Sequence, residues 1–341
     1  RVMAALEEAE KPLICIGGGV FAAHAENEIR ELADIMQIPV ITTMMGISVF
    51  PDDDQLFCGM IGTHGVKMAN AAVNECDVLF LVGARVGDRA VKTPLALEKT
   101  TKIIHIDIDP AEIGKNIGAD LPLVGDAKLV LQQMTELAKP MKHDEWIAHI
   151  KTLGGERKYV EPAKGTVNPR VFIDRLAKKM PANVTVVADV GQNQIWTCTE
   201  YKFRKEGRLL TSGGMGTMGY SVPAAIGAKM ADDSRATVAI CGDGAFQMSF
   251  MELATAVQFG VDIKVVVMTN NRLGMVRELQ TNGYHDRQTA VFLDGSPDFI
   301  KLAEAYGIPA MRVYDDDTME KGVEMLAEHK GICLVEVVVD K

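Results

Sequence analysis

A carboxylate and an amide stand at the ends of two strand-like runs in the later part of the chain. Asp243 follows the apolar run 237–241 inside a Gly-Asp-Gly turn, and Asn270 follows the run 263–268. A helical pattern between the runs makes a strand-helix-strand crossover, so the strands are parallel and, if neighbours, end about 4.8 Å apart at one sheet edge. One carboxylate beside a neutral amide oxygen leaves room for phosphate oxygens around Mg²⁺. The spacing therefore predicts a diphosphate held through magnesium.

The turn itself suits a phosphate group. Gly242 and Gly244 let the backbone approach a ligand closely, and the helix after Gly244 directs its amino end toward the same place. Taken singly, a Gly-Asp-Gly turn and an Asn-Asn strand cap are ordinary features that need no ligand. It is their spacing across one crossover that indicates a binding site.

Two series of alternating elements surround these residues. Short runs rich in β-branched residues alternate with helical patterns, which is typical of a doubly wound parallel sheet covered on both faces. The first series has expected strands at 13–16, 40–43, 78–82 and 103–108 and helices at 26–36, 66–76 and 127–137. The second has strands at 184–188, 237–241, 263–268, 310–313 and 333–339 and helices at 170–179, 222–230, 249–259, 298–306 and 318–329. We therefore predict an α/β fold with two doubly wound domains.

The segment 139–168 separates the two series. It combines prolines, glycines and many charges with weak periodicity, which favours a linker. We expect domains at 1–138 and 169–341. Arg1 opens inside a helical pattern with no initiator Met before it, and we expect the chain to be a fragment of a longer protein.

Composition narrows the class of protein. The 341 residues are 48% hydrophobic and 24% charged, with a net charge of −10, which excludes disorder and coiled coil and disfavours nucleic acid and membrane surfaces as partners. The six cysteines are far apart and form no Cys-x-x-Cys pair. We expect reduced, buried thiols and a cytoplasmic protein.

The first series opens with a glycine-rich turn after a strand. The segment 16–22 fits a Gly-x-Gly-x-x-Ala dinucleotide fingerprint. The fingerprint also needs an acidic residue at the end of a second strand about 20 positions later, where Thr42 and Thr43 stand instead. A nicotinamide dinucleotide site is therefore disfavoured.

Longer stretches of the chain resemble a known family. The segments CGDGAFQMSFMELATAV (241–257) and VVVMTNNRLGMV (265–276) resemble the thiamine diphosphate signature. In detail the chain is similar to the acetolactate synthase family of thiamine diphosphate enzymes. TSGGMGTMGYSVPAAIGAK (211–229), GMIGTHGVKMANAAV (59–73), GARVGDR (83–89) and IIHIDIDPAEIGKN (103–116) extend the resemblance over nearly the whole chain.

The resemblance implies an activity and a cofactor site. The activity is decarboxylation of pyruvate and carboligation to a second 2-oxo acid, giving 2-acetolactate for branched-chain amino acid biosynthesis. The implied Mg²⁺ ligands are Asp243, Asn270 and the backbone carbonyl of Arg272. Met218 would hold the cofactor in a bent shape, and Asn193 stands where members often have His. The implied cofactor contacts are Val190, Gly191, Gln192, Asn193, Gly216, Met218, Gly242, Gly244, Ala245, Leu273, Gly274, Met275 and Val276.

For the first domain the resemblance implies FAD in an extended, redox-idle role. Arg85 and Arg89 could pair with diphosphate oxygens, and Asp107 and Asp126 could accept hydrogen bonds from ribose or adenine. The implied contact positions are Gly18, Gly19, Thr43, Met44, His64, Gly83, Arg85, Asp88, Arg89, Asp107, Ile108 and Asp126.

Two departures from the family pattern keep alternatives open. Members commonly have Phe-Asp where this chain has Val86-Gly87, so an adenine nucleotide alone is an alternative to FAD. Members commonly have Trp where Leu279 stands, which leaves the choice between pyruvate and 2-oxobutyrate open. Another thiamine diphosphate-dependent 2-oxo acid decarboxylase, oxidase or carboligase is the alternative function, and an inactive cofactor-binding fragment is a third.

The resemblance also implies a missing group. In this family the glutamate that activates the cofactor belongs to an amino-terminal pyrimidine-binding domain that would precede Arg1, and it is supplied across a dimer interface. We therefore expect no catalytic acid or base in this chain and no turnover by the chain alone. The expected assembly is a homodimer or homotetramer with a possible small regulatory subunit.

Overall fold

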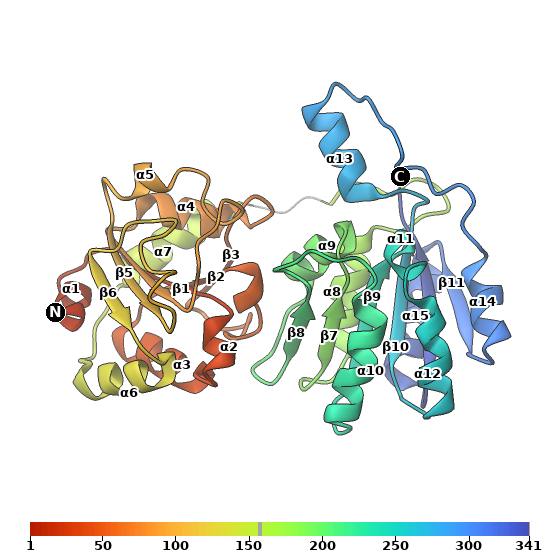
Figure 1. The fold of residues 1–341 in the computed structure, drawn as a ribbon, viewed down its shortest axis with the longest axis horizontal. Coiled ribbons are helices and arrows are strands. Elements are labelled where there is room, and N and C mark those ends of the chain that lie inside the picture. The colour runs from red at the N-terminus through yellow and green to blue at the C-terminus, as the bar shows by residue number, and fades with distance from the viewer. Residues whose placement is uncertain (156–158, 341) are drawn as a thin grey trace. The chain divides into compact units, whose positions relative to one another are not determined.

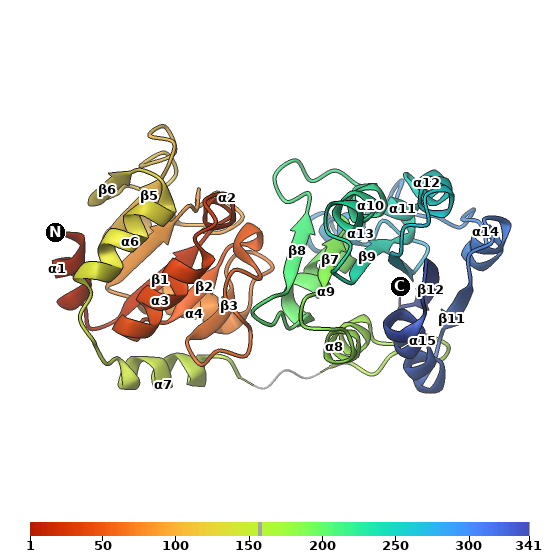
Figure 2. The same ribbon diagram turned by 90° about the horizontal axis from the view of Figure 1, so that it is seen from below.

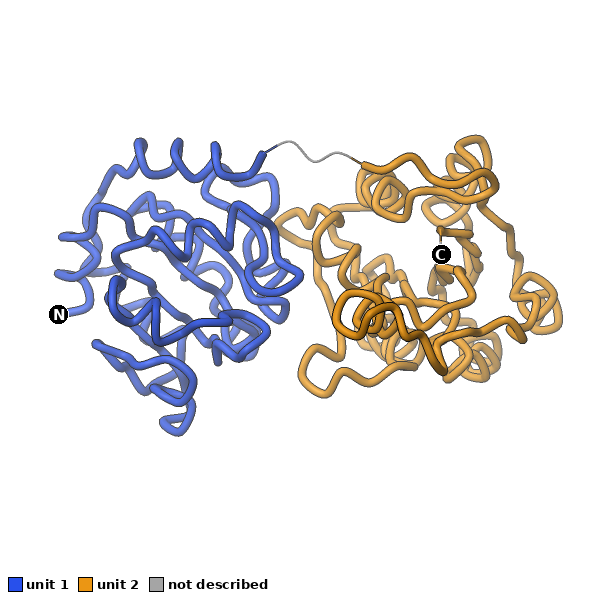
Figure 3. The backbone as a smooth tube through the Cα atoms, turned by 90° about the horizontal axis from the view of Figure 1, so that it is seen from above, with its two compact units in different colours: residues 1–157 blue, residues 158–341 orange. Residues whose placement is uncertain are grey.

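The computed structural model describes residues 1–155 and 159–340 (Figure 1). The chain divides into two compact units, unit 1 (residues 1–157) and unit 2 (residues 158–341), which Figure 3 shows in different colours. Each unit is built on a sheet of six parallel strands with helices on both faces. The predicted class, α/β with doubly wound parallel sheets, is confirmed.

The sheet of unit 1 has the order β3-β2-β1-β4-β5-β6. From β1 the chain adds β2 and β3 on one side, and it then returns to add β4, β5 and β6 on the other side of β1. The topology therefore switches between β1 and β4. Open α/β sheets bind ligands at such a point, beyond the carboxyl ends of the strands. The strands are β1 (Pro12–Ile16), β2 (Val40–Thr42), β3 (Phe57–Met60), β4 (Val78–Val82), β5 (Lys102–Asp107) and β6 (Leu121–Val124).

Two apolar cores cover the faces of this sheet. One core takes buried side chains from α1 (Val2–Glu7), α3 (Glu26–Met36) and α6 (Ala127–Leu137). The other takes them from α4 (Lys67–Glu75), α5 (Pro94–Leu97) and α7 (Asp144–Leu153). The short elements α2 (Gly19–Ala22) and η1 (Met44–Gly46) follow the carboxyl ends of β1 and β2.

Helix α7 lies inside the segment 139–168 that the sequence analysis expects to be a linker. Trp146 and Ile150 are buried on α7, which packs on α4, and the indole Nε1 of Trp146 donates to the carbonyl of Pro12 at 3.0 Å. Trp146 and Ile150 lie one turn apart on this helix, but the prolines, glycines and charges of the whole segment obscure that spacing in the sequence. The part up to residue 153 is therefore integral to unit 1, and residues 156–158 of the expected linker lie outside the described residues.

The sheet of unit 2 has the order β11-β12-β10-β9-β7-β8, so its topology switches between β7 and β9. Its central strands β9 and β10 are almost entirely buried, which is why they read as continuous apolar runs in the sequence. The strands are β7 (Thr185–Ala188), β8 (Arg208–Thr211), β9 (Thr237–Gly242), β10 (Lys264–Thr269), β11 (Ala310–Val313) and β12 (Cys333–Val338).

Helices cover both faces of this sheet as well (Figure 2). One face carries α10 (Ser221–Ala231), α12 (Leu253–Gln258) and α14 (Phe299–Ala305). The other carries α8 (Pro169–Lys179), α9 (Gln192–Glu200) and α15 (Asp316–Glu328). The helix expected at 249–259 is divided into η2 (Phe250–Glu252) and α12. In Figure 1, α13 (Gly274–Gly283) projects from the body of unit 2, and it has no buried residue.

All six cysteines are free and buried. Burial raises the pKa of the thiols of Cys15, Cys58, Cys76 and Cys198 to about 12. Cysteines with so little thiolate are packing residues rather than nucleophiles. Among the described residues no helix has both the length and the apolar character needed to cross a membrane.

Candidate active site

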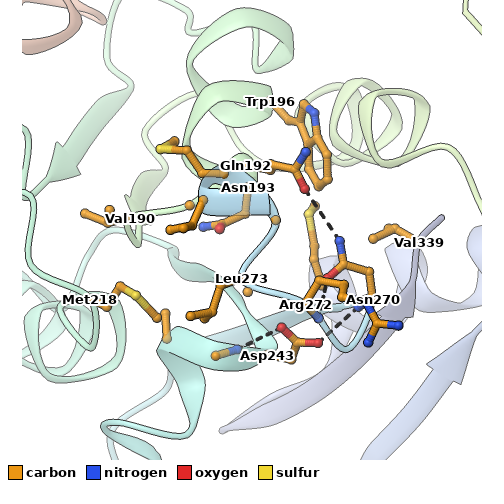
Figure 4. A pocket seen from close by; sticks show the side chains of 18 residues that line it. Val190, Gln192, Asn193, Trp196, Met218, Asp243, Asn270, Arg272, Leu273 and Val339 are labelled. Carbon is orange, nitrogen blue, oxygen red and sulfur yellow. Dashed lines mark hydrogen bonds between the residues drawn. The ribbon is translucent and has the colours of Figure 1, made fainter. Parts of the chain in front are cut away.

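A pocket opens at the carboxyl edge of the sheet in unit 2, where the chain leaves β7, β9 and β10 (Figure 4). It encloses about 560 Å³ of empty space, part of it open to solvent. This is the switch point of the sheet, the place where ligands bind to folds of this kind. The lining residues are Val190, Gly191, Gln192, Asn193, Trp196, Met218, Gly242, Asp243, Gly244, Ala245, Met268, Asn270, Arg272, Leu273, Gly274, Met275, Val276 and Val339.

Asp243 and Asn270 meet in this pocket. Strands β9 and β10 are parallel neighbours, with Gly242 opposite Met268, so the two residues follow the same edge. The carboxylate of Asp243 accepts hydrogen bonds from the backbone N–H groups of Asn270 at 3.1 Å and Asn271 at 2.6 Å. The side-chain oxygen of Asn270 accepts from the backbone N–H of Arg272 at 3.1 Å. The structure thus brings together the two residues whose side-chain oxygens the sequence spacing predicts as metal ligands.

The environment of Asp243 suits a bound cation. The residue is 2% exposed, and burial raises the pKa of its carboxyl group while backbone N–H groups, among them that of Gly244 at 2.8 Å, lower it. A cation beside this carboxylate would stabilise its charged form. No cluster of three His, Cys, Asp or Glu side chains suited to a metal occurs in the described ranges. An ion here would therefore need amide, carbonyl and ligand oxygens, the set that Mg²⁺ accepts.

The turn after β10 orients the groups around Asn270. Asn271 has a φ of 54°, a left-handed conformation that Asn tolerates better than most residues. The guanidinium of Arg272 donates to Asp294 at 2.8 Å and to the carbonyl of Asn271 at 2.6 Å, and it lies 4.6 Å from the centre of the Phe292 ring. The side chain of Arg272 is thus committed to its own loop.

Two glycines make room in the pocket. A Cβ on Gly244 would lie 2.7 Å from the Leu273 side chain and 3.3 Å from the Met218 methyl group, so these two apolar side chains converge over the turn. A Cβ on Gly274 would lie 1.9 Å from the side-chain oxygen of Gln192. Glycine at these positions lets α9, α13 and the turn after β9 approach one another around the pocket.

The side chain of Asn193, which lines the pocket, is held by the ends of two strands. Its amide nitrogen donates to the carbonyls of Asp189 at 2.8 Å and Ile240 at 3.2 Å, and it therefore ties β7 to β9. Both amide hydrogens are directed at the protein, so the side chain offers a phosphate no donor. The amino end of α9 begins at Gln192, and its backbone N–H groups remain the better candidates for that contact.

The other expected contact positions of unit 2 are distributed as follows. Val190, Gly191 and Gln192 line the pocket at the start of α9, and Leu273, Gly274, Met275 and Val276 line it at the start of α13. Gly216 does not line it; its φ of 66° bends the loop that carries Met218. The binding roles of all these residues stay predictions.

Sequence reasoning missed four residues at this edge. Trp196, Met268 and Val339 line the pocket, and Asp189 is completely buried beside it. Asp189 follows β7 as Asp243 follows β9, and a search for polar residues at strand ends would have found it. Trp196 lies one turn into α9 and gives no such signal.

Unit 1 gathers its expected nucleotide contacts at the corresponding edge of its own sheet. Gly18 and Gly19 follow β1, Thr43 and Met44 follow β2, His64 follows β3, Gly83, Arg85, Asp88 and Arg89 follow β4, Asp107 and Ile108 end and follow β5, and Asp126 follows β6. All of them therefore lie at or just beyond the carboxyl ends of the strands of one sheet.

Some residues at this edge have roles in the fold itself, in close backbone contact or in capping a helix. A Cβ on Gly17, next to the predicted contact Gly18, would lie 2.1 Å from the carbonyl oxygen of Gly83, so the turns after β1 and β4 touch through their backbones. Asp126 caps α6 by accepting from the backbone N–H of Leu129 at 3.1 Å. Arg85 and Arg89 are exposed. The binding roles of the unit 1 residues stay predictions.

Comparison with known proteins places this geometry in a family. Residues 1–134 match the model of the thiamine pyrophosphate enzyme central domain, and residues 189–337 match that of the C-terminal TPP binding domain. Thiamine pyrophosphate is another name for thiamine diphosphate. The expected contact positions of unit 1 all fall in the first match, and the pocket residues of unit 2 fall in the second except Val339.

Relatives are similar over nearly the whole chain. A probable acetolactate synthase large subunit of Methanocaldococcus jannaschii is 40% identical over 98% of this chain and 58% of its own length. An acetolactate synthase large subunit of Lactococcus lactis is 35% identical over 100% of this chain and 60% of its own length. The corresponding protein of Corynebacterium glutamicum is 40% identical over 90% of this chain and 51% of its own length. The chain thus spans little more than half the length of the curated relatives it matches, and it belongs to the thiamine pyrophosphate enzyme family, with acetolactate synthase large subunits as its relatives.

Proposed function

We propose that the full-length protein is a thiamine diphosphate- and Mg²⁺-dependent acetolactate synthase. In this proposal it is a transferase that decarboxylates pyruvate and joins the remaining two-carbon unit to a second 2-oxo acid, giving 2-acetolactate for branched-chain amino acid biosynthesis. The observation that carries the proposal is the meeting of Asp243 and Asn270 beside the glycine turn in the pocket of unit 2. The similarity to acetolactate synthase large subunits supports the choice of reaction.

The donor set of the pocket fits a magnesium diphosphate. Asp243, the side-chain oxygen of Asn270 and the backbone carbonyl of Arg272 would hold the ion and leave its remaining positions to phosphate oxygens. The amino end of α9 and the backbone at Gly244 would bind the diphosphate through N–H groups. The proposal needs no cationic side chain in the pocket, which agrees with the commitment of Arg272 to Asp294.

The apolar part of the pocket would receive the ring end of the cofactor. Met218 and Leu273 converge over Gly244, where they would hold the cofactor bent and exclude water. When bound, the thiazolium ring supplies the carbon nucleophile and the electron sink for decarboxylation. Met275 and Val276 stand at the start of α13 and would border the substrate.

The pocket lacks an acid or base of its own. Asp243 is the one carboxylate among its lining residues in the described part of the chain, and its proposed place is on the metal. Glu252, close to Asp243 in sequence, accepts from the hydroxyl of Thr255 at 3.1 Å and does not line the pocket. We therefore propose that the activating glutamate comes from another domain across a subunit interface, in a homodimer or homotetramer, and that this chain alone does not turn over.

Further proposals concern the partners and the second cofactor. The relatives named as large subunits favour a small regulatory subunit as a partner. The edge of unit 1, at the switch between β1 and β4, is the proposed site of FAD, with an adenine nucleotide alone as the alternative. The six buried free thiols favour a cytoplasmic location, and a flavoprotein is proposed only with the FAD site of unit 1.

Product analysis tests the reaction. The purified full-length protein receives pyruvate, Mg²⁺ and thiamine diphosphate, and the products are identified by NMR. Acetolactate as the main product supports the proposal. Acetaldehyde would indicate a decarboxylase and acetyl phosphate or acetate an oxidase, and either would refute it. A visible spectrum of the same sample, with flavin absorbance or without it, decides between FAD and an adenine nucleotide.

A further inference from the structure

We propose that Asp189 is a positioning residue that fixes Met218 over the cofactor pocket. The inference rests on the proposed function, since it assigns Asp189 to the shape of the thiamine diphosphate site. Asp189 does not itself line the pocket, but it is hydrogen-bonded to Val190 and Asn193, which do. It acts through the loop 212–220, which lies between β8 and α10 and carries Met218.

The carboxylate of Asp189 is a buried clamp on that loop. The residue is 0% exposed and its two oxygens accept three backbone hydrogen bonds. One oxygen accepts from Val190 at 2.9 Å and from Gly219 at 3.0 Å, and the other accepts from Ser221 at 2.7 Å. Gly219 directly follows Met218, so the clamp closes one residue from the side chain it would position.

The other end of the loop is held by neutral groups. The hydroxyl of Ser212 accepts from the backbone N–H of Thr217 at 3.2 Å and lies 2.8 Å from the Thr217 hydroxyl. Gly216 donates from its backbone N–H to the carbonyl of Ser212 at 2.8 Å. Met218 therefore stands between an exposed polar anchor and a buried charged one. Hydrogen bonds to a charged acceptor are about twice as strong as neutral ones, so the buried anchor dominates.

The backbone of Asp189 connects the same clamp to the rest of the site. Its N–H donates to the carbonyl of Ile240 on β9 at 2.8 Å, and its carbonyl accepts from the side chain of Asn193 on α9. One residue thus joins β7, β9, the amino end of α9 and the Met218 loop. A displacement of the loop would move the Met218 methyl group away from its place beside Gly244.

The arrangement requires a carboxylate rather than an amide. In one orientation of an Asn side chain at this position, its NH₂ group would face the N–H of Ser221. In the other orientation it would face the N–H groups of Val190 and Gly219. Either way, at least one backbone N–H would lose its acceptor and meet another donor. The loss of a charged hydrogen bond of this kind corresponds to roughly 10- to 100-fold in an equilibrium. Side-chain volume hardly changes, and the substitution therefore tests the contacts and not the packing.

The experiment uses Asp189→Asn in the full-length protein with bound Mg²⁺ and thiamine diphosphate. The readout is the rate of hydrogen–deuterium exchange at thiazolium C2, measured by quenched NMR at saturating cofactor, because it reports how closely the pocket holds the cofactor in its bent shape. We expect at least about tenfold slower exchange. Met218→Ala should slow it as well, and the double variant should be no slower than Met218→Ala, because both changes act through one contact.

Asp77→Asn is the matched control. Asp77 in unit 1 also pins a distant backbone segment with both oxygens, accepting from Glu10 at 2.7 Å and Lys11 at 3.0 Å. It should lower the melting temperature without changing the exchange rate. If Asp189→Asn behaves in the same way, or if its effect adds fully to that of Met218→Ala, the positioning role is refuted.

A folding defect does not remove the test. If Asp189→Asn does not fold, Ser212→Ala loosens the same loop from its exposed end and should slow exchange by about two- to fivefold; an unchanged rate then refutes the proposal. Wild-type protein that binds no thiamine diphosphate would instead refute the proposed function itself, so the two failures are distinguishable.

Discussion

The two units share one plan and differ in what stands at the same edge of the sheet. Each has six parallel strands, a switch of topology beside its first strand and a turn rich in glycine at the carboxyl end. Both edges hold a buried carboxylate, Asp243 at 2% exposure in unit 2 and Asp107 at 9% in unit 1, but in unit 1 Arg85, Asp88 and Arg89 are exposed beside it. The shared architecture fixes where a ligand binds, and the side chains decide which ligand it is.

The glycines at the sheet edges also differ between the two units. In unit 1, Gly17 and Gly83 allow two backbones to touch, a contact that the fold itself requires. In unit 2, Gly244 and Gly274 face the side chains of Leu273, Met218 and Gln192 around an open pocket. Glycines of unit 1 should therefore matter for stability, and those of unit 2 for binding.

The largest expected effect is that of Asp243→Ala on cofactor binding. Asp243→Ala removes the one carboxylate among the described lining residues, the proposed metal ligand, so the affinity for thiamine diphosphate in the presence of Mg²⁺ should fall by on the order of 1000-fold. Isothermal titration with and without Mg²⁺ measures it. Asp298→Ala is the control, since Asp298 accepts from the backbone N–H of Ile300 at 3.0 Å at the start of α14 and lies outside the pocket. Equal affinities of wild type and Asp243→Ala would exclude the metal assignment.

Alkaline pH should destabilise both units, because each buries three thiols. Their folded-state pKa is raised to about 12 for Cys15 and Cys198 and to about 11 for Cys333. An unfolded thiol ionises near pH 8.5, so the folded state holds more protons above that value. The stability is complete below about pH 8 and is lost toward pH 12, at up to about 1.4 kcal/mol per thiol and pH unit.

Urea unfolding at pH 7.5 and 10 measures this loss separately in each unit. The chain has two tryptophans, Trp146 in unit 1 and Trp196 in unit 2. Trp196→Phe leaves a reporter of unit 1, and Trp146→Phe leaves a reporter of unit 2. The expected loss is similar in both, and a midpoint that did not move in either would contradict the buried state of the thiols.

The same contrast between buried and exposed segments explains how much the sequence could predict. The central strands β1, β4, β9 and β10 are buried, with only Gly242 at the end of β9 partly exposed, and their apolar runs were read correctly. The edge strands β3, β6 and β8 were missed, because alternate residues are partly exposed in each and β6 contains a proline. These three strands carry too few buried positions to form an apolar run. The edge strand β11 was nevertheless predicted at its observed bounds, although Val313 is its one buried residue in the described structure, so exposure is not the whole reason for the misses.

The site divides in a similar way. Asp243 and Asn270 could be paired from the sequence because one crossover joins their strands. Asp189 accepts hydrogen bonds from Gly219 and Ser221, which lie about 30 positions later in the chain, after β8. No local sequence pattern predicts a contact over that separation. Helix α9 was missed because most of its residues are buried regardless of polarity, so it has no amphipathic stripe.

Gly17→Ala tests the structural glycines of unit 1. Its Cβ would meet the backbone of Gly83 at 2.1 Å, and a backbone cannot rotate away as a side chain can. We expect the free energy of unfolding of unit 1 to fall by about 3 kcal/mol, as in other overpacked positions. Urea unfolding followed by Trp146 fluorescence measures it.

Gly274→Ala is the matched change in unit 2. Its Cβ would meet the end of the Gln192 side chain, which is able to move, so the unfolding free energy should change by less than about 1 kcal/mol while cofactor affinity falls. If instead Gly17→Ala left unit 1 stable, or Gly274→Ala left affinity unchanged, the division between structural and pocket glycines would be wrong.

The smallest expected effect is a gain of stability confined to unit 2. Gly227 lies inside α10 with open space where a Cβ would stand, so Gly227→Ala should raise the free energy of unfolding by about 0.5–1 kcal/mol, because alanine loses less backbone entropy in a helix. Gly307 also has open space but a φ of 72°, and Gly307→Ala should lower it by about 1 kcal/mol. The Trp196 reporter should detect both changes and the Trp146 reporter neither. Changes of opposite sign in the free energy of unfolding at two equally open positions would show that backbone conformation, and not room for the methyl group, decides the effect. An unchanged affinity for thiamine diphosphate in both variants would show that the stability of unit 2 can change without a change in its pocket.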